Sequence, residues 1–124
     1  MMAGELSHAI EDAAREVYET LGGSGYAESV YQHALQIELQ LRGVNADIEV
    51  PCVVMYKGKA IGIGRLDLVV SVGEETVAVE LKAIQKLNIN AEKQLLGYMR
   101  VTGAKHGVLI NFGCTSIEIK RIVP

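Results

Sequence analysis

The fold is decided by the stretch VAVELKAI, residues 77–84, in which two charged side chains interrupt an apolar run. Side chains alternate along a strand, so Glu80 and Lys82 share one face and apolar residues fill the other. Burying a carboxylate is costly unless the group is paired or binds a metal. We therefore predict that Glu80 and Lys82 have a role that offsets the cost of placing charges at the apolar centre of a strand.

The preceding strand carries a third charge of this kind. In RLDLVV, residues 65–70, Asp67 lies among residues that belong in a core. A turn at residues 73–75 folds this segment back, so that Asp67 is expected opposite Glu80 or within one residue of it. The two carboxylates then converge, with the ammonium of Lys82 beside them. The alternative is a structural Asp–Lys–Glu ion-pair cluster on a half-exposed sheet.

The surrounding sequence supplies helices and further strands in the order ααβββαββ. Ser24 is expected to cap the second helix, and the second strand is expected to bend near Gly62 and Gly64. A helical crossover between the third and fourth strands suits a parallel pair. The sequence therefore predicts an α/β (α+β) fold with a central mixed sheet flanked by helices. The expected helices are 6–21, 26–42 and 90–102, and the expected strands are 48–56, 60–72, 76–82, 106–111 and 116–123.

Length and composition bound the class of protein. The 124 residues fit one domain, residues 1–124, and 49% of them are hydrophobic. The formal net charge of −3 counts against binding nucleic acid through bulk charge alone, but it allows a local basic groove. The two cysteines are far apart, so we expect free thiols and no zinc site. We find no bilayer-length apolar run and no signal-peptide pattern, so we expect a cytoplasmic protein with no membrane partner.

The paired acids point to a divalent metal. Two hard oxygen ligands, Asp67 and Glu80, together with a nearby backbone carbonyl, that of Leu81, suit Mg²⁺ or Mn²⁺. Such an ion lowers the pKa of bound water and neutralises charge that develops on a phosphate. Lys82 is then placed to contact the attacking water or the scissile phosphate.

Two polar residues follow on the helix after this strand. Gln94 and Tyr98 are spaced i, i+4, so they occupy one helix face near the end of the strand. The alternative is an ordinary polar helix edge. Arg65, two residues before Asp67, is expected on the same strand face. It either contacts a phosphate or forms an ion pair that holds Glu80 or Glu28.

A third acid opens the second helix. Glu28 lies in GYAESVY, residues 25–31, after a glycine-rich break. An acid in the first turn interacts well with the helix dipole, and the alternative is a third carboxylate that reaches the metal directly or through water. Tyr31, three residues later, shares its helix face.

Three of these patterns together resemble a known superfamily. Asp67, a gap and the segment ELK, residues 80–82, give the D…ExK signature of the PD-(D/E)XK nucleases. The segment QLLGY, residues 94–98, resembles the QxxxY motif of their exonuclease branch, and residues 25–31 match the motif that names the GxxExxY family. The resemblance covers nearly the whole chain and implies a restriction-endonuclease-like core.

The resemblance also implies chemistry and roles. It implies hydrolysis of the phosphodiester bonds of DNA, or RNA, by metal-activated water, with Mg²⁺ or Mn²⁺ as cofactor. The matching acids bind the metal, with Glu28 completing the set; Lys82 assists the water, and Gln94 supports the lysine or the substrate. We assign Tyr98, Arg65 and Tyr31 to substrate binding.

Other functions stay open on the sequence alone. One is a non-catalytic nucleic-acid-binding or regulatory interaction module that keeps the nuclease fold, which the acidic net charge favours. Another is a small assembly subunit in which the charged triplet is structural. Because one small domain offers a short grip on a duplex, we expect a homodimer or a larger partner protein alongside nucleic acid, DNA in the first place.

Overall fold

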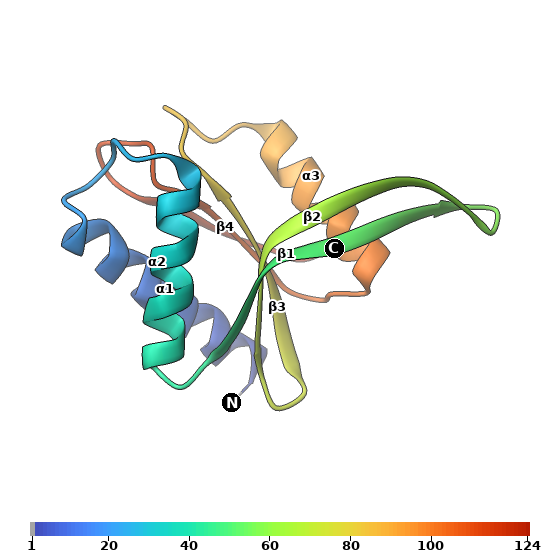
Figure 1. Ribbon diagram of the computed structural model, residues 1–124, viewed down its shortest axis with the longest axis horizontal. Helices are drawn as coiled ribbons and strands as arrows, with labels where there is room; N and C mark the ends of the chain where they lie inside the picture. The colour runs from blue at the N-terminus through green and yellow to red at the C-terminus, as the bar shows by residue number, and fades with distance from the viewer. Residues whose placement is uncertain (1) are drawn as a thin grey trace.

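The computed structural model describes residues 2–124 as a mixed five-stranded sheet with helices on both faces (Figure 1). The predicted element order is confirmed. The elements are α1 (Ala3–Thr20), α2 (Glu28–Leu41), β1 (Asn45–Tyr56), β2 (Lys59–Val72), β3 (Glu75–Lys82), α3 (Ile89–Thr102), β4 (Gly107–Asn111) and β5 (Glu118–Ile122).

The strands lie in the sheet in chain order, β1-β2-β3-β4-β5. Neighbouring strands pair antiparallel, except β3 and β4, which pair parallel across the α3 crossover. The parallel pair predicted from the helical connection is therefore confirmed. β3 is the central strand, which explains why its segment reads as an apolar run.

Each face of the sheet carries its own apolar cluster. α1 and α2 cover one face, and helical spacing brings the apolar side of α1 onto it. α3 covers the other face through Leu95 and Met99. Burying each large apolar side chain stabilises the fold by ~1.5–3 kcal/mol. The residues of α1 that are buried there include Leu6, Ile10, Ala13, Ala14 and Val17.

The helix starts agree with the sequence only in part. Asn88 caps α3 close to the expected start at residue 90, because its side chain accepts a hydrogen bond from the backbone N–H of Ala91 at 3.1 Å. The predicted cap of α2 is wrong. Ala27 occupies that position, and it makes no side-chain cap bond. Ser24 lies three residues earlier, in a loop in which Gly25 adopts a φ of 127°.

Part-way along the β1–β2 hairpin, the even-numbered side chains switch from one face of the sheet to the other. Ala46 and Leu68 pack on the α1–α2 side, whereas Cys52 and Leu66 pack on the α3 side, although all four occupy even positions. Glu49 lies at the change with a φ of 54°, in the left-handed region that non-glycine residues rarely adopt. The strands therefore twist sharply here, a feature that the sequence did not indicate.

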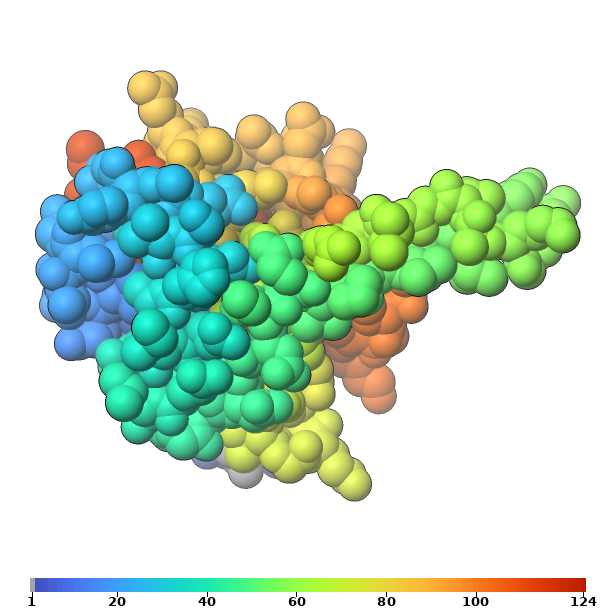
Figure 2. Space-filling model, viewed as in Figure 1, coloured from blue at the N-terminus to red at the C-terminus, as the bar shows by residue number. Residues whose placement is uncertain are grey.

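Beyond this twist the hairpin projects from the body as an arm, residues 50–66 (Figures 1 and 2). Val54 pairs with Gly62 and Met55 pairs with Ala60, so Ile61 is an extra residue in β2. This is a β-bulge beside Gly62, close to the predicted bend. Glu49, outside the arm, marks the larger change of direction.

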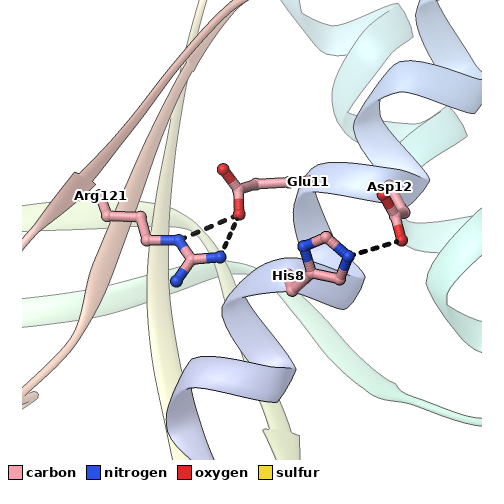
Figure 3. Close-up of polar contacts among 4 residues, drawn as sticks. All are labelled: His8, Glu11, Asp12 and Arg121. Atoms are coloured by element: carbon pink, nitrogen blue, oxygen red, sulfur yellow. Dashed lines mark hydrogen bonds and ion pairs between the residues drawn. The ribbon is translucent and has the colours of Figure 1, made fainter.

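Polar contacts hold α1 to the far edge of the sheet (Figure 3). The guanidinium of Arg121 on β5 donates two hydrogen bonds to one carboxylate oxygen of Glu11, at 3.0 and 2.6 Å. His8 lies on the surface of α1, with its Nε2 3.4 Å from Oδ2 of Asp12. Among residues 2–124, no helix is both long and apolar enough to span a membrane.

Candidate active site

The β2 and β3 strands separate next to Asp67 and Glu80. The last backbone pair of this ladder joins Leu68 to Val79. Beyond it, the N–H of Asp67 donates to Oε1 of Glu80 at 3.2 Å, and the N–H of Leu81 donates to Oδ2 of Asp67 at 2.7 Å. Carboxylates thus replace backbone carbonyls as acceptors. The predicted approach of the two acids across the turn is observed.

Lys82 is held by the face of α3 that the i, i+4 spacing predicted. Its Nζ donates to Oε1 of Gln94 at 3.0 Å, and Nε2 of Gln94 donates to the hydroxyl of Tyr98 at 3.4 Å. The ring of Tyr98 lies on Gly64, where an added Cβ would be 2.4 Å from ring carbon Cε1. One chain of contacts therefore joins the base of the arm to the lysine.

Glu28 faces the same place from the other side of the sheet. It is the first residue of α2 and is exposed. Partial burial and the negative charge of Asp67 raise its pKa, while Lys82 acts in the opposite direction. The start of α2 therefore brings a third carboxylate toward the gap between β2 and β3.

The acids of this cluster ionise less readily than free carboxyls. Burial raises the pKa of Glu80 to about 8, and the charge of Asp67 adds to the effect. Burial also raises the pKa of Asp67, although its hydrogen bond from Leu81 acts in the opposite direction. Lys82 lowers the pKa of both groups without cancelling the rise. A further cation would stabilise the ionised cluster.

The donor set fits a hydrated divalent ion better than a closed cage. Within residues 2–124, no three His, Cys, Asp or Glu side chains are arranged to hold a metal among themselves. Mg²⁺, however, keeps several waters and binds one or two carboxylates. Asp67 and Glu80 each use one oxygen for a backbone N–H, which leaves the other available. The carbonyl of Leu81 lies on the same strand edge as its N–H, toward this gap.

Comparison with protein families agrees with this geometry. The profile described as the PD-(D/E)XK nuclease superfamily matches residues 4–122. The chain belongs to this superfamily. No curated protein matches the chain in a sequence search.

Two solved structures align with this chain. The crystal structure of a protein named SSO0001 aligns with a TM-score of 0.61 and 21% identity, over 77% of this chain and 48% of that one. The chain thus spans about half the length of SSO0001. Hjc, a Holliday junction resolvase from Archaeoglobus fulgidus, aligns with a TM-score of 0.48 and 19% identity, over 77% of this chain and 71% of its own. The superfamily match over residues 4–122, together with the mixed five-stranded sheet flanked by helices, confirms the predicted restriction-endonuclease-like core.

Tyr31 supports the site from within the core of this superfamily member. Its side chain is fully buried and stacks on Phe112 with ring centroids 4.5 Å apart. Its hydroxyl donates to the carbonyl of Gly23 at 2.7 Å, which holds the loop before α2. A ring without exposed surface offers no contact to a substrate, so the burial of Tyr31 does not fit its predicted role in substrate binding.

Arg65 differs from expectation in its surroundings. It is exposed on β2 opposite Pro51, and within residues 2–124 it forms no ion pair with Glu80 or Glu28. The alternation that placed Arg65 and Asp67 on one face does not continue through the twist. Of the two sequence interpretations, the phosphate contact is the one that stays open.

Two residues near the site were missed from the sequence. Nε2 of buried Gln32 donates to Oε1 of Glu49 at 3.1 Å and to the carbonyl of Asp67 at 2.9 Å. Gln32 follows Glu28 by four residues, and this spacing could have placed it on the same helix face. Glu49 gave no such signal, because its left-handed backbone depends on tertiary contacts.

Proposed function

We propose that this chain is a Mg²⁺- or Mn²⁺-dependent nuclease that hydrolyses phosphodiester bonds of DNA, with RNA as the alternative substrate. The observation that carries the proposal is the separation of β2 and β3, where the carboxylates of Asp67 and Glu80 meet. Lys82 is near enough to lower the pKa of both acids. We further propose that residues 1–124 form a single domain of this type and that the chain belongs to the GxxExxY family.

The acids and one carbonyl form the proposed metal ligands. Asp67, Glu80 and the carbonyl of Leu81 hold the ion, and Glu28 completes its surroundings directly or through water. When bound, a divalent ion supplies a Lewis acid and lowers the pKa of a bound water. Support comes from the raised pKa values of the three carboxyls, which a cation would reverse.

The remaining side chains orient and stabilise the substrate. Water adds to phosphorus and loses a proton to solvent, one P–O ester bond breaks, and the leaving oxygen takes up a proton from solvent. The ammonium of Lys82, held by Gln94, donates to the attacking water or to a phosphate oxygen as negative charge develops. Tyr98 keeps Gln94 in place and borders the substrate, and Arg65 contacts a neighbouring phosphate.

The test uses labelled DNA and RNA, single-stranded and duplex, with Mn²⁺, Mg²⁺ or EDTA. We expect metal-dependent cleavage of at least one substrate by the wild-type chain. Lys82→Ala should reduce the rate by about 10²-fold or more, because it removes a group that acts on the reacting atoms. Lys86→Ala is the matched control, since Lys86 is an exposed lysine four residues away.

The outcomes separate the candidate functions. Cleavage that persists both in EDTA and in Lys82→Ala would rule out this centre. Mn²⁺ binding without cleavage of any substrate would favour the non-catalytic binding module. A homodimer or a larger partner stays part of the proposal, because one small domain offers a short contact surface.

A further inference from the structure

The arm carries only positively charged side chains, in contrast to the rest of the chain. Residues 50–66 contain three of the twelve Lys and Arg residues and none of the fifteen Asp and Glu residues. The rest of the chain therefore carries a formal charge of −6 against +3 on the arm. Lys57 and Lys59 flank its tip, and Arg65 lies at its base, two residues before Asp67. An approaching polyanion is attracted by the arm and repelled by the body.

The arm also exposes apolar side chains that the body does not cover. Val53, Met55, Ile61 and Ile63 are between 44% and 68% exposed. Tyr56 is exposed at the tip, with Nζ of Lys57 5.5 Å from its ring centroid. Apolar surface kept on a projecting hairpin marks a place of contact.

The arm begins at the candidate active site. Asp67 directly follows its last residue, and the ring of Tyr98 lies on Gly64 within it. Lys59 is eight residues from Asp67 along β2, so the arm reaches ~26 Å at ~3.3 Å per residue. At ~3.4 Å per step of a DNA strand, this distance covers about eight base pairs.

We propose that the arm lies in a groove of a nucleic-acid duplex and holds it beside the site. Two-stranded β-ribbons fit the major groove, where apolar side chains contact the thymine methyl groups. Lys57 and Lys59 would bind phosphates beyond those at the cleavage site. The inference rests on the proposed nuclease function and names the duplex as its substrate.

Charge favours a duplex over a second arm as the occupant. Pairing two arms through their apolar faces would bring two +3 segments together, whereas phosphates complement them. A protein partner on the apolar face is therefore treated as a competing outcome of the test.

The test measures binding of the full chain to a fluorescein-labelled DNA duplex over a series of salt concentrations, with EDTA to prevent cleavage. The variant is Lys57→Glu with Lys59→Glu. We expect at least a tenfold loss of affinity. The slope of log K against log salt should become less negative by ~1.8, because each phosphate that the variant no longer neutralises accounts for ~0.9. The control, Arg15→Glu with Lys105→Glu, makes the same charge change at exposed positions outside the arm and should stay within about twofold of wild type.

Equal affinities for the arm and control variants would overturn the inference. So would a wild-type dimer in sedimentation that Ile63→Ser dissociates while duplex affinity stays unchanged, because the arm would then bind a second copy. Loss of duplex binding in the arm variant, beside a wild type that cleaves nothing with Mn²⁺, supports the arm and contradicts the nuclease proposal. Metal-dependent cleavage by the wild type, with unchanged duplex binding in the arm variant, supports the nuclease proposal and contradicts the role of the arm.

Discussion

Glu80 makes the folded chain sensitive to pH. Burial raises its pKa from an ordinary value of 4.5 to about 8. Between these values the folded state holds a proton that the unfolded state has lost. Without metal, this contribution to stability is therefore fully present below pH 4.5 and is lost as the pH rises through 8.

Glu80→Gln should remove this dependence. The amide keeps an acceptor for the N–H of Asp67 but does not ionise. Without metal, we expect the variant to have a higher Tm than wild type at pH 8, by ~4 °C or more, and little gain at pH 5. Thermal unfolding followed by circular dichroism measures both. Glu74→Gln, in the exposed turn, is the control. An equal gain at both pH values would contradict the assignment.

Gly64 on β2 has no side chain, and the ring of Tyr98 on α3 occupies the space that a side chain would fill. An added Cβ would lie 2.4 Å from the ring of Tyr98, so the ring would have to move away from β2. Gly64→Ala should displace Tyr98 and with it Gln94 and Lys82. We expect ~10²-fold slower cleavage, because a small misplacement of a reacting group has effects of this size. Cleavage assays with the labelled substrate measure it.

The neighbouring glycine supplies the control for that experiment. At Gly62 an added Cβ meets only Cβ of Val54, at 4.0 Å, so Gly62→Ala should cleave normally. The double variant Gly64→Ala, Tyr98→Ala restores the space but leaves Gln94 without its tyrosine partner. Full activity in Gly64→Ala would show that the ring of Tyr98 does not position the lysine.

Gly113 fixes the loop after β4 against the loop after β3. A Cβ there would lie 2.3 Å from both the backbone nitrogen and the carbonyl oxygen of Ile84. Because backbone cannot rotate away, Gly113→Ala should lower the free energy of unfolding by about 3 kcal/mol. Gly97→Ala, on α3 with nothing within 4 Å, should instead raise it by up to ~1 kcal/mol. Urea denaturation measures both, and equal stability of the two variants would contradict this view.

The elements themselves followed from local patterns. Periodic apolar residues gave the helices and strands to within a few residues, and glycines marked their ends, as Gly103 does with a φ of 76°. The prediction of Ser24 as the cap of α2 was wrong, because the backbone geometry around Gly25 decides where that helix begins. The twist at Glu49 could not be predicted, because Gln32 from another element bonds that side chain.

For the molecule as a whole, the approach of Asp67 and Glu80 was predictable and the rest of the cluster less so. A short turn between adjacent strands sets their register, which sequence spacing shows. Glu28 approaches only because two helices pack on the sheet, and spacing does not show this. The burial of Tyr31 likewise depends on Phe112 from the far end of the chain. The catalytic roles stay predictions.

Metal binding should stabilise the whole chain through this cluster. At a Mn²⁺ concentration 100 times its Kd, linkage predicts ~2.7 kcal/mol of added stability. The gain should be larger at pH 8 than at pH 6, because the ion binds ionised carboxylates and Glu80 has a pKa of about 8. Asp67→Asn should lose most of it, and Asp12→Asn, on the surface of α1, should keep it. Tm measured with and without Mn²⁺ decides; an equal gain in both variants would place the ion elsewhere.

Where β2 and β3 separate, two backbone N–H groups donate hydrogen bonds to carboxylates and not to backbone carbonyls. Those of Asp67 and Leu81 depend on side chains whose protonation varies, unlike amides bonded within a regular ladder. The amide nitrogen and proton resonances of Asp67 and Leu81 should therefore shift in NMR spectra as Glu80 and Asp67 titrate. The rate at which these amide protons exchange with deuterium should change when a metal ion binds. The backbone thus contains its own spectroscopic reporter, with no need for an attached dye.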